Sequence, residues 1–246
     1  MKIIISPAKK MKREQEVVEP QTVPIFLAKT ERLKQYLQSL SYEALKDLLC
    51  CNDQIAQLNY ERYQTMDLTR QLTPAIVAFD GIQYQYMAPH VFEYGSFDYV
   101  QNNLRILSGF YGLLKPLDGV VPYRLELQAK VKTDFCRNLY DFWKDLVYCE
   151  LVRQDDVIVN LASVEYSKLV SRFIKPPMRM ITCIFGELQG EKVREKGVYV
   201  KMARGEMVQY MAKQNVQVVE EMQHFHGLGY SFSRRHSDDE HYVFLK

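Results

Sequence analysis

The chain has 246 residues, of which 47% are hydrophobic and 25% are charged, and its formal net charge at pH 7 is +2. This composition predicts a globular protein with a substantial core, and the small net charge excludes the strongly basic class of nucleic-acid coat proteins. The sequence contains no apolar run of about 18 residues, and its start MKIIISPAKK has too short an apolar part for a signal peptide, so we expect a cytoplasmic protein without a membrane span.

The cysteines and histidines predict no metal site. The five cysteines are odd in number and lack C-x-x-C spacing, which argues against a disulfide framework and against structural zinc, so we expect free thiols. The adjacent Cys50 and Cys51 are either buried small apolar residues or a redox sensor, and we favour the first interpretation. The glycine-rich phosphate-loop and dinucleotide patterns are also missing. We therefore predict neither a metal nor a cofactor.

The first predicted element is a buried strand from Lys2 to Ser6, where an isoleucine run is ended by a proline. It leads into a loop that carries Lys9 and Lys10, within the densest basic run of the chain at residues 9–13. This run is either a solvated loop or part of a phosphate-binding surface. Residues 13–24 suit an extended connector.

Three helices are predicted next, because leucines recur at roughly helical spacing over residues 25–42 and capping residues follow. Ser41 caps the second helix, and Asn52 caps a third that reaches about Met66. The second and third helices form a helix-hairpin-helix-like element, and the backbone N–H groups at the start of the third can contact phosphate. The turn has no glycine to let backbone approach phosphate closely, so a plain packing hairpin is the alternative.

In the middle of the chain, residues 75–79 (AIVAF) predict a second buried strand, and residues 104–114 are buried as either a helix or a strand. Small residues and turn-formers then lead into an extended run at residues 122–126. Because side chains alternate along an extended run, Arg124 and Glu126 share one face and can form an ion pair. That pair either holds the strand in place or orients Arg124 toward an anionic ligand such as phosphate.

In the second half, residues 157–160 predict a third buried strand, and Ser163 caps the helix behind it. Two antiparallel hairpins are predicted, one within residues 178–193 and one within residues 230–244.

A longer helix is predicted over residues 198–214. Lys201 and Arg204 are three residues apart on it, so both cations project from one side, and Gly205 beside them lets another backbone come close.

These strand–helix units with terminal hairpins predict an α+β fold. We expect a single domain over residues 1–246, with a mixed β-sheet flanked by helices and the helix-hairpin-helix-like element within it. No internal repeat, low-complexity segment or clear linker divides the chain. The sequence does not predict an oligomeric state.

Six stretches carry a resemblance to a known family, and they keep the family's order from residue 6 to residue 232. They are Ser6 to Lys9, residues 104–127, Leu139 to Trp143, Asn160 to Tyr166, Lys201 to Gly205 and Gly229 to Phe232. Through them essentially the whole chain resembles the peroxide-stress protein YaaA family. The resemblance implies a helix-hairpin-helix element and DNA binding. It also implies a part in limiting free intracellular iron, and so oxidative damage, under hydrogen peroxide.

Cations, hydroxyls and aromatic side chains accumulate in these stretches. Because a lone buried cation is costly unless it is paired, they imply either an internal salt-bridge network or an anionic ligand at a cleft, and we favour the cleft. The predicted nucleic-acid- or anion-binding residues are Lys9, Lys10, Asn52, Arg105, Arg124, Lys201 and Arg204. The predicted supporting residues are Tyr84, Tyr111, Glu126, Ser163 and Glu165.

Two classes of function fit these residues. The first is sequence-tolerant binding of DNA or of another phosphate-bearing ligand, which weakens steeply with salt because Lys and Arg contacts to phosphate dominate it. The second is an enzyme acting on a small anionic substrate in the same cleft, with Tyr84, Ser163, Glu165 or Lys201 as acid, base or nucleophile. The enzyme requires a deep pocket in which a carboxylate meets a lysine or tyrosine. We favour the first class and assign no catalytic residue.

Overall fold

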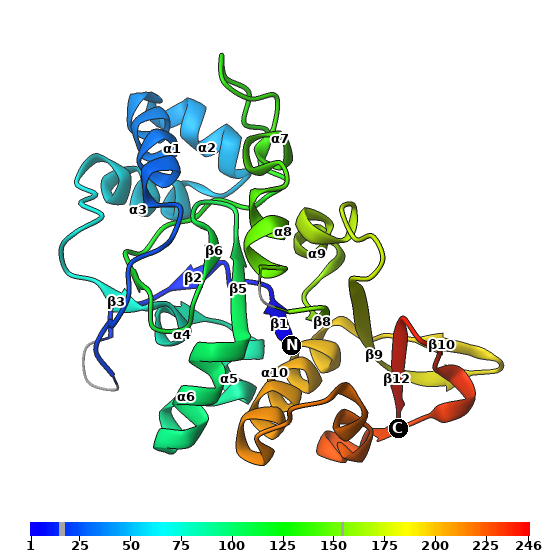
Figure 1. The fold of residues 1–246 in the computed structure, drawn as a ribbon. Coiled ribbons are helices and arrows are strands. Elements are labelled where there is room, and N and C mark those ends of the chain that lie inside the picture. Colours follow the sequence, from blue (N-terminus) through cyan, green and yellow to red (C-terminus); the bar gives the residue numbers. More distant parts are fainter. Residues whose placement is uncertain (15–17, 154) are drawn as a thin grey trace.

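A mixed β-sheet organises the protein, as the computed structural model of residues 1–14, 18–153 and 155–246 shows (Figure 1). Within this described part the sheet has eight strands in the order β11-β12-β9-β8-β1-β5-β6, with β10 beside β9. The parallel strands are β1 (Lys2–Ile5), β5 (Leu104–Ser108), β8 (Val157–Leu161), β9 (Arg179–Gln189) and β12 (His241–Leu245). The strands paired antiparallel to them are β6 (Gly112–Leu114), β10 (Lys192–Arg194) and β11 (Ser231–Phe232). The prediction of a mixed sheet flanked by helices is confirmed.

Two small antiparallel pairs lie apart from this sheet. They are β2 (Lys10–Met11) with β4 (Phe79–Asp80), and β3 (Thr73–Pro74) with β7 (Gly119–Val120).

The helices gather in two groups in Figure 1, with α1, α2, α3 and α7 in the upper part of the view and α5, α6 and α10 in the lower part. The first helices are α1 (Leu27–Ser39), α2 (Tyr42–Leu49), α3 (Asp53–Gln64), α4 (Ala75–Ala78) and α5 (Ile82–Met87). The later ones are α6 (Tyr94–Asn103), α7 (Leu139–Trp143), α8 (Leu146–Leu151), α9 (Val164–Ser171) and α10 (Gly197–Gln214). Short 3₁₀ turns are Pro89–Val91, Val219–His224, Gly227–Gly229 and Arg234–His236.

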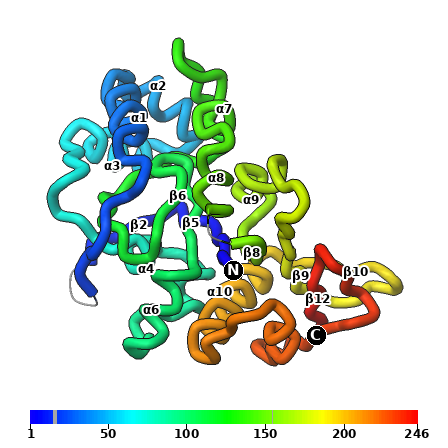
Figure 2. Tube along the Cα trace, in the orientation of Figure 1, coloured from blue at the N-terminus to red at the C-terminus, as the bar shows by residue number. Residues whose placement is uncertain are grey.

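The isoleucine run of β1 lies in the middle of the sheet because both of its edges are paired. Ile3, Ile4 and Ile5 have no exposed surface, with β5 on one side and β8 on the other. Figure 2 traces the chain from this central strand to the C-terminus at the end of β12. The carboxyl end of β1 therefore lies near the middle of the carboxyl edge of the sheet.

Both predicted helix caps of the α2–α3 hairpin are confirmed. The Ser41 side chain accepts the Ala44 N–H at 3.3 Å, and the Asn52 side chain accepts the Ile55 N–H at 3.0 Å. The two helices form a hairpin, but its function as a DNA-binding helix-hairpin-helix element is not confirmed. Lys46 pairs with Asp53 at 2.7 Å, so the start of α3 is already occupied by groups of the chain itself.

The predicted strand at residues 75–79 is wrong over most of its length. Ala75 to Ala78 form the short helix α4, and only Phe79 continues into a strand. Every residue of α4 is buried. An apolar run that is buried on all sides has no periodicity that separates a helix from a strand, so the sequence could not decide between them.

Several other expectations are decided by the structure. The ambiguous stretch at residues 104–114 forms the antiparallel strands β5 and β6, and both predicted hairpins are present. The predicted connector at residues 13–24 includes residues 15–17, which lie outside the described residues. The cysteines are free thiols, but Cys50 is exposed at the C-cap of α2, so its assignment as a buried residue is wrong.

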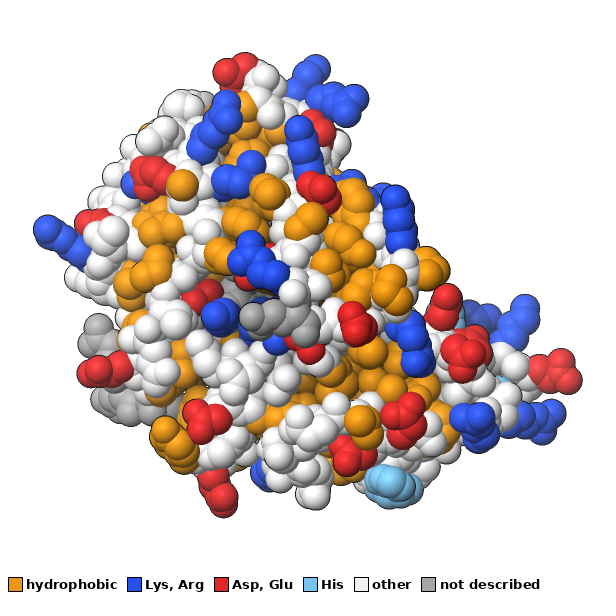
Figure 3. All heavy atoms as spheres, in the orientation of Figure 1, with side chains coloured by type: hydrophobic (Ala, Val, Ile, Leu, Met, Phe, Trp, Pro, Cys, Tyr) orange, Lys and Arg blue, Asp and Glu red, His pale blue; other side chains and the backbone are white. Residues whose placement is uncertain are grey.

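Charge is spread rather than segregated on the face that Figure 3 shows. Basic and acidic side chains are interspersed over it, between patches of hydrophobic side chains. This agrees with the formal net charge of +2. A binding surface must therefore be found from local clusters of cations.

Candidate functional site at the carboxyl edge of the sheet

The strand order creates a crevice at the carboxyl end of β1. The chain goes from β1 to β5 on one side and later to β8 on the other side, so connections leave β1 in opposite directions. Ligands of open parallel sheets bind outside the carboxyl ends of strands at such a switch point. Ser6 directly follows β1, and Ser163 lies two residues after β8, which brings both residues to this edge.

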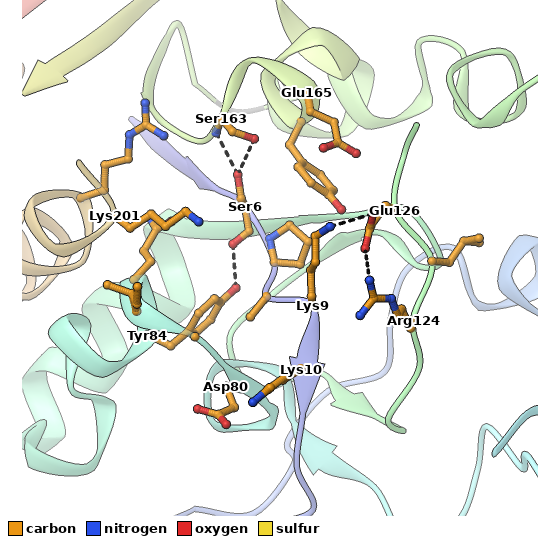
Figure 4. A pocket seen from close by; sticks show the side chains of 18 of the residues that line it. Ser6, Lys9, Lys10, Asp80, Tyr84, Arg124, Glu126, Ser163, Glu165 and Lys201 are labelled. Carbon is orange, nitrogen blue, oxygen red and sulfur yellow. Dashed lines mark hydrogen bonds and ion pairs between the residues drawn. The ribbon is translucent and has the colours of Figure 1, made fainter. Parts of the chain in front are cut away.

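A pocket of about 470 Å³ lies there, within the usual size range of small-molecule sites (Figure 4). We call it the carboxyl-edge pocket. Its charged lining residues are Lys9, Lys10, Asp80, Arg124, Glu126, Glu165, Lys201 and Arg204. Its other lining residues are Ser6, Pro7, Ala8, Gly81, Ile82, Gln83, Tyr84, Tyr123, Leu125, Ser163 and Tyr166.

Hydrogen bonds among Ser6, Tyr84 and Ser163 connect the segments that line this pocket. The Ser163 N–H donates to Ser6 Oγ at 2.8 Å, and the two seryl hydroxyls are 3.2 Å apart. The Tyr84 hydroxyl donates to the Ser6 carbonyl at 2.9 Å. Ser163 occupies the N-cap position of α9 as predicted, but its side chain accepts no N–H of that helix. The loops after β1 and β8 are thereby held together.

Glu126 is shared by two of the predicted cations. Its Oε2 lies 3.1 Å from Lys9 Nζ, and its Oε1 lies 3.2 Å from Arg124 Nη2 (Figure 4). The expected Arg124–Glu126 pair is therefore present. Arg124 Nε is buried without a hydrogen-bond partner, so the guanidinium is incompletely satisfied. One carboxylate therefore contacts both cations.

Close packing and hydroxyls position the segment that carries Arg124. A Cβ on Gly109 would lie 2.4 Å from the Leu125 carbonyl oxygen, so only glycine fits against this segment. The Tyr63 hydroxyl donates to the Arg124 carbonyl at 2.7 Å. Tyr111, which does not line the pocket, accepts the Val121 N–H at 3.2 Å. Tyr111 therefore contacts the segment that leads to Arg124 and does not contact the pocket itself.

Lys201 and Arg204 reach the opposite wall from α10 because that helix packs tightly on α5. A Cβ on Gly205 would lie 2.1 Å from the Gln83 carbonyl oxygen, which confirms that this glycine allows the close approach. Neither cation has a carboxylate within 4.0 Å among the described residues. Burial lowers the pKa of Arg204, and its Nε has no hydrogen-bond partner.

Glu165 adds a carboxylate of a different character. It lies in the first turn of α9, where its Oε1 accepts the Gln128 N–H at 3.2 Å. Burial raises the pKa of Glu165, and the nearby charge of Glu126 raises it further. A carboxyl group whose pKa is raised by burial is a candidate for proton transfer.

Two predicted binding residues lie elsewhere. Arg105 lines a separate cavity of about 360 Å³ with Asp118 and Glu150, and its Nη1 donates to the carbonyls of Gln101 and Leu104. Asn52 is engaged in capping α3. Neither residue joins the carboxyl-edge pocket. Arg105 is the second residue of β5, so it lies at the amino end of the parallel strands.

The predicted site residues left out five polar residues of the pocket, which are Ser6, Asp80, Gln83, Tyr123 and Tyr166. Asp80 pairs with Lys10 in the β2–β4 ladder, Gln83 donates to the Leu161 carbonyl at 3.3 Å, and Tyr166 lies beside Glu165. The turn signal after residue 79 and the position of Tyr166 within a recognised stretch were the available clues. Neither clue indicates which loops meet in space.

Two absences hold for residues 1–14, 18–153 and 155–246. There, no three His, Cys, Asp or Glu side chains are grouped so that they could hold a metal ion. In the same residues, no helix combines the length and the apolar character that crossing a membrane requires.

Comparison with known proteins gives the family. The family model described as "Peroxide stress protein YaaA" matches residues 1–236. The chain belongs to the peroxide stress protein YaaA family. A UPF0246 protein of Desulfitobacterium hafniense is 57% identical over 246 residues, which are 100% of this chain and 98% of that protein. UPF0246 proteins of Lachnoclostridium phytofermentans and Pediococcus pentosaceus are 51% and 48% identical over 100% of this chain and 96% and 98% of theirs. Membership supports a role in peroxide stress and confirms the resemblance.

Proposed function

We propose that the protein binds DNA without sequence preference, through phosphate contacts made by the cations of the carboxyl-edge pocket. The observation that supports this most is that Lys9, Lys10, Arg124, Lys201 and Arg204 converge there from three distant stretches of the chain. Their charges outnumber those of the three carboxylates in the same lining. Lys201 and Arg204, which lack a carboxylate partner in the described part of the chain, would make the principal contacts.

Retardation of a short duplex of mixed sequence at about 50 mM salt tests this proposal, because electrostatic binding is strongest at low salt. Lys201→Ala should weaken binding by roughly three- to tenfold. It should also reduce the slope of log affinity against log salt concentration by the amount expected for about one phosphate contact. Lys213→Ala is the matched control, since Lys213 lies on the same helix and its Nζ contacts Gln209 instead of the pocket. Absence of retardation at this salt concentration would overturn the proposal.

We also propose that the protein acts in the cytoplasm and that it lowers the level of free intracellular iron during peroxide stress. We propose an indirect route, in which the protein does not itself store the metal. A deletion strain carrying either the wild-type protein or the Lys201→Ala variant tests this, with free iron read by electron paramagnetic resonance. Only the wild type should lower it. Full complementation by Lys201→Ala would separate the effect on iron from DNA binding.

A second candidate is an enzyme that acts on a small anionic substrate in the same pocket. Two observations favour it: Lys9 Nζ lies 3.1 Å from Glu126 in a concave site, and burial raises the pKa of Glu165 beside it. Turnover of phosphate esters would be followed by nuclear magnetic resonance. The enzyme hypothesis requires turnover that Glu165→Gln abolishes without weakening DNA binding, and it fails if no ester is consumed.

A further inference from the structure

Three arginines line a second depression, which we call the arginine groove. Arg13 follows β2, Arg62 lies in α3, and Arg70 lies in the turn after α3. The groove has a volume of about 830 Å³. Its carboxylates are Glu61 and Asp67.

The charges in the arginine groove are unevenly balanced. Arg70 Nε lies 3.5 Å from Asp67, and Glu61 accepts a hydrogen bond from Gln57 at 2.6 Å. Arg13 has no ion pair or hydrogen bond with any of the described residues. Burial lowers the pKa of Arg62, and the charge of Arg13 lowers it further. Within the described residues neither Arg13 nor Arg62 has a carboxylate within 4.0 Å, and two neighbouring guanidinium groups so placed favour an anion between them.

The arginine groove and the carboxyl-edge pocket both lie next to β2. Lys10 lines the pocket and Arg13 lines the groove, and Met11 and Lys12 lie between them in the chain. The Arg62 Nη2 donates to the Met11 carbonyl at 3.4 Å from the groove side. The Tyr123 N–H approaches Met11 Sδ at 3.4 Å from the pocket side. One short strand therefore separates the two sites.

The length of this path suits a polymer of phosphates. Lys9 and Arg13 are four residues apart in the chain, a separation that spans at most roughly 13 Å when fully extended. One strand of a duplex carries a phosphate about every 3.4 Å along the axis, so several phosphates fit along that path. A small anion would occupy only one of the two sites. The guanidinium fork of arginine matches the geometry of phosphate oxygens.

We propose that a nucleic-acid strand held at the carboxyl-edge pocket continues into the arginine groove, where Arg13, Arg62 and Arg70 contact its phosphates. This inference rests on the proposed function, because it requires the pocket cations to bind phosphate first. It adds a binding site at the groove and a minimum ligand length. Short nucleotides fill the pocket alone, and longer strands reach both sites.

Fluorescence anisotropy with a thymidine dinucleotide and with an oligothymidylate of about eight residues tests the inference. Arg13→Ala should weaken binding of the longer strand about threefold and lower its salt slope by roughly 0.7, while the dinucleotide binds unchanged. Arg13 is exposed and has no ion pair or hydrogen bond with the described residues, so its replacement should leave the fold intact. Lys12→Ala is the matched control, because Lys12 pairs with Glu14 at 3.0 Å and lines neither site. It should leave both affinities unchanged.

The outcomes separate this inference from the proposed function. If Arg13→Ala leaves the long strand unaffected while Lys201→Ala weakens both ligands, the groove is not part of the path and only the inference fails. If Lys201→Ala weakens neither ligand, the proposed function fails and the inference falls with it. Equal displacement of the long strand by hexaglutamate would identify an acidic peptide as the occupant and would also overturn the inference.

Discussion

At the amino edge of the parallel strands, Lys2 and Arg105 are held by groups of the chain itself, whereas at the carboxyl edge Lys201 and Arg204 have no carboxylate partner within the described residues. Lys2 Nζ lies 2.9 Å from Asp155, and Arg105 donates to two backbone carbonyls. Both edges are rich in cations. The comparison shows that the partner of a cation, and not its residue type, decides whether it is available to a ligand.

The difference follows from what adjoins the strands. Asp155 lies just before β8, and the parallel register brings it to the start of β1. At the other end, Ser6 and Ser163 follow the strands and hydrogen-bond to each other. Neither serine carries a charge, and within the described residues no carboxylate lies within 4.0 Å of the α10 cations Lys201 and Arg204. Four substitutions test this comparison, from the largest expected effect to the smallest.

Gly205→Ala should have the largest effect, because the new Cβ would lie 2.1 Å from the Gln83 carbonyl oxygen. We expect a loss of roughly 2–3 kcal/mol in the free energy of unfolding, measured by urea denaturation. Gly197→Ala on the same helix is the control, since a Cβ there has no atom within 4 Å. Similar stabilities for the two variants would contradict the tight α10–α5 contact.

Arg105→Leu should affect stability without affecting DNA binding. It removes two hydrogen bonds from a charged, 9% exposed side chain, which predicts a loss of about 2 kcal/mol in the free energy of unfolding. Anisotropy should give the wild-type affinity for duplex DNA at a temperature where the variant is folded. A folded variant with weakened DNA binding would place the amino edge in the interface.

Asn52→Ala tests whether the α2–α3 hairpin or the carboxyl-edge pocket contacts DNA. Losing the cap on Ile55 should lower the free energy of unfolding by about 1 kcal/mol. Its affinity for DNA should stay unchanged, because the start of α3 is occupied by Asp53 and Lys46. Weakened retardation without a change in fold would show that the hairpin contacts DNA.

Glu165→Gln tests the pocket electrostatics through pH. Burial raises the pKa of Glu165 in the folded state, so the folded protein binds its proton more tightly than the unfolded chain does. The contribution of Glu165 to the free energy of unfolding of the wild type is therefore present near pH 4 and is lost as the pH rises through the pKa of the folded state. The variant should therefore melt slightly higher than wild type at pH 8, and the difference should shrink toward pH 4. A pH-independent difference would contradict the burial effect.

Local signals predicted much of the fold. The isoleucines of β1, the caps at Ser41 and Asn52, and the terminal hairpin all depend on neighbours in the chain, and the structure contains each of them. Residues 75–79 were assigned wrongly because an apolar run buried on every side fits either a helix or a strand.

The candidate site was predictable only in part, because its assembly depends on strand order. Arg124 and Glu126 were paired from their spacing, and Lys201 was placed beside a close-packed glycine. The position of β1 between β5 and β8 follows from long-range pairing. Arg105 is separated from the pocket because it lies at the amino end of β5.

The most direct test of the central claim is a crystal structure of the protein with a short DNA duplex. The account predicts phosphate oxygens within about 4 Å of Lys201 Nζ and of the Arg204 guanidinium, at the carboxyl edge of the sheet. Phosphates bound only at the Asn52 turn, or only along the amino edge near Arg105, would contradict it.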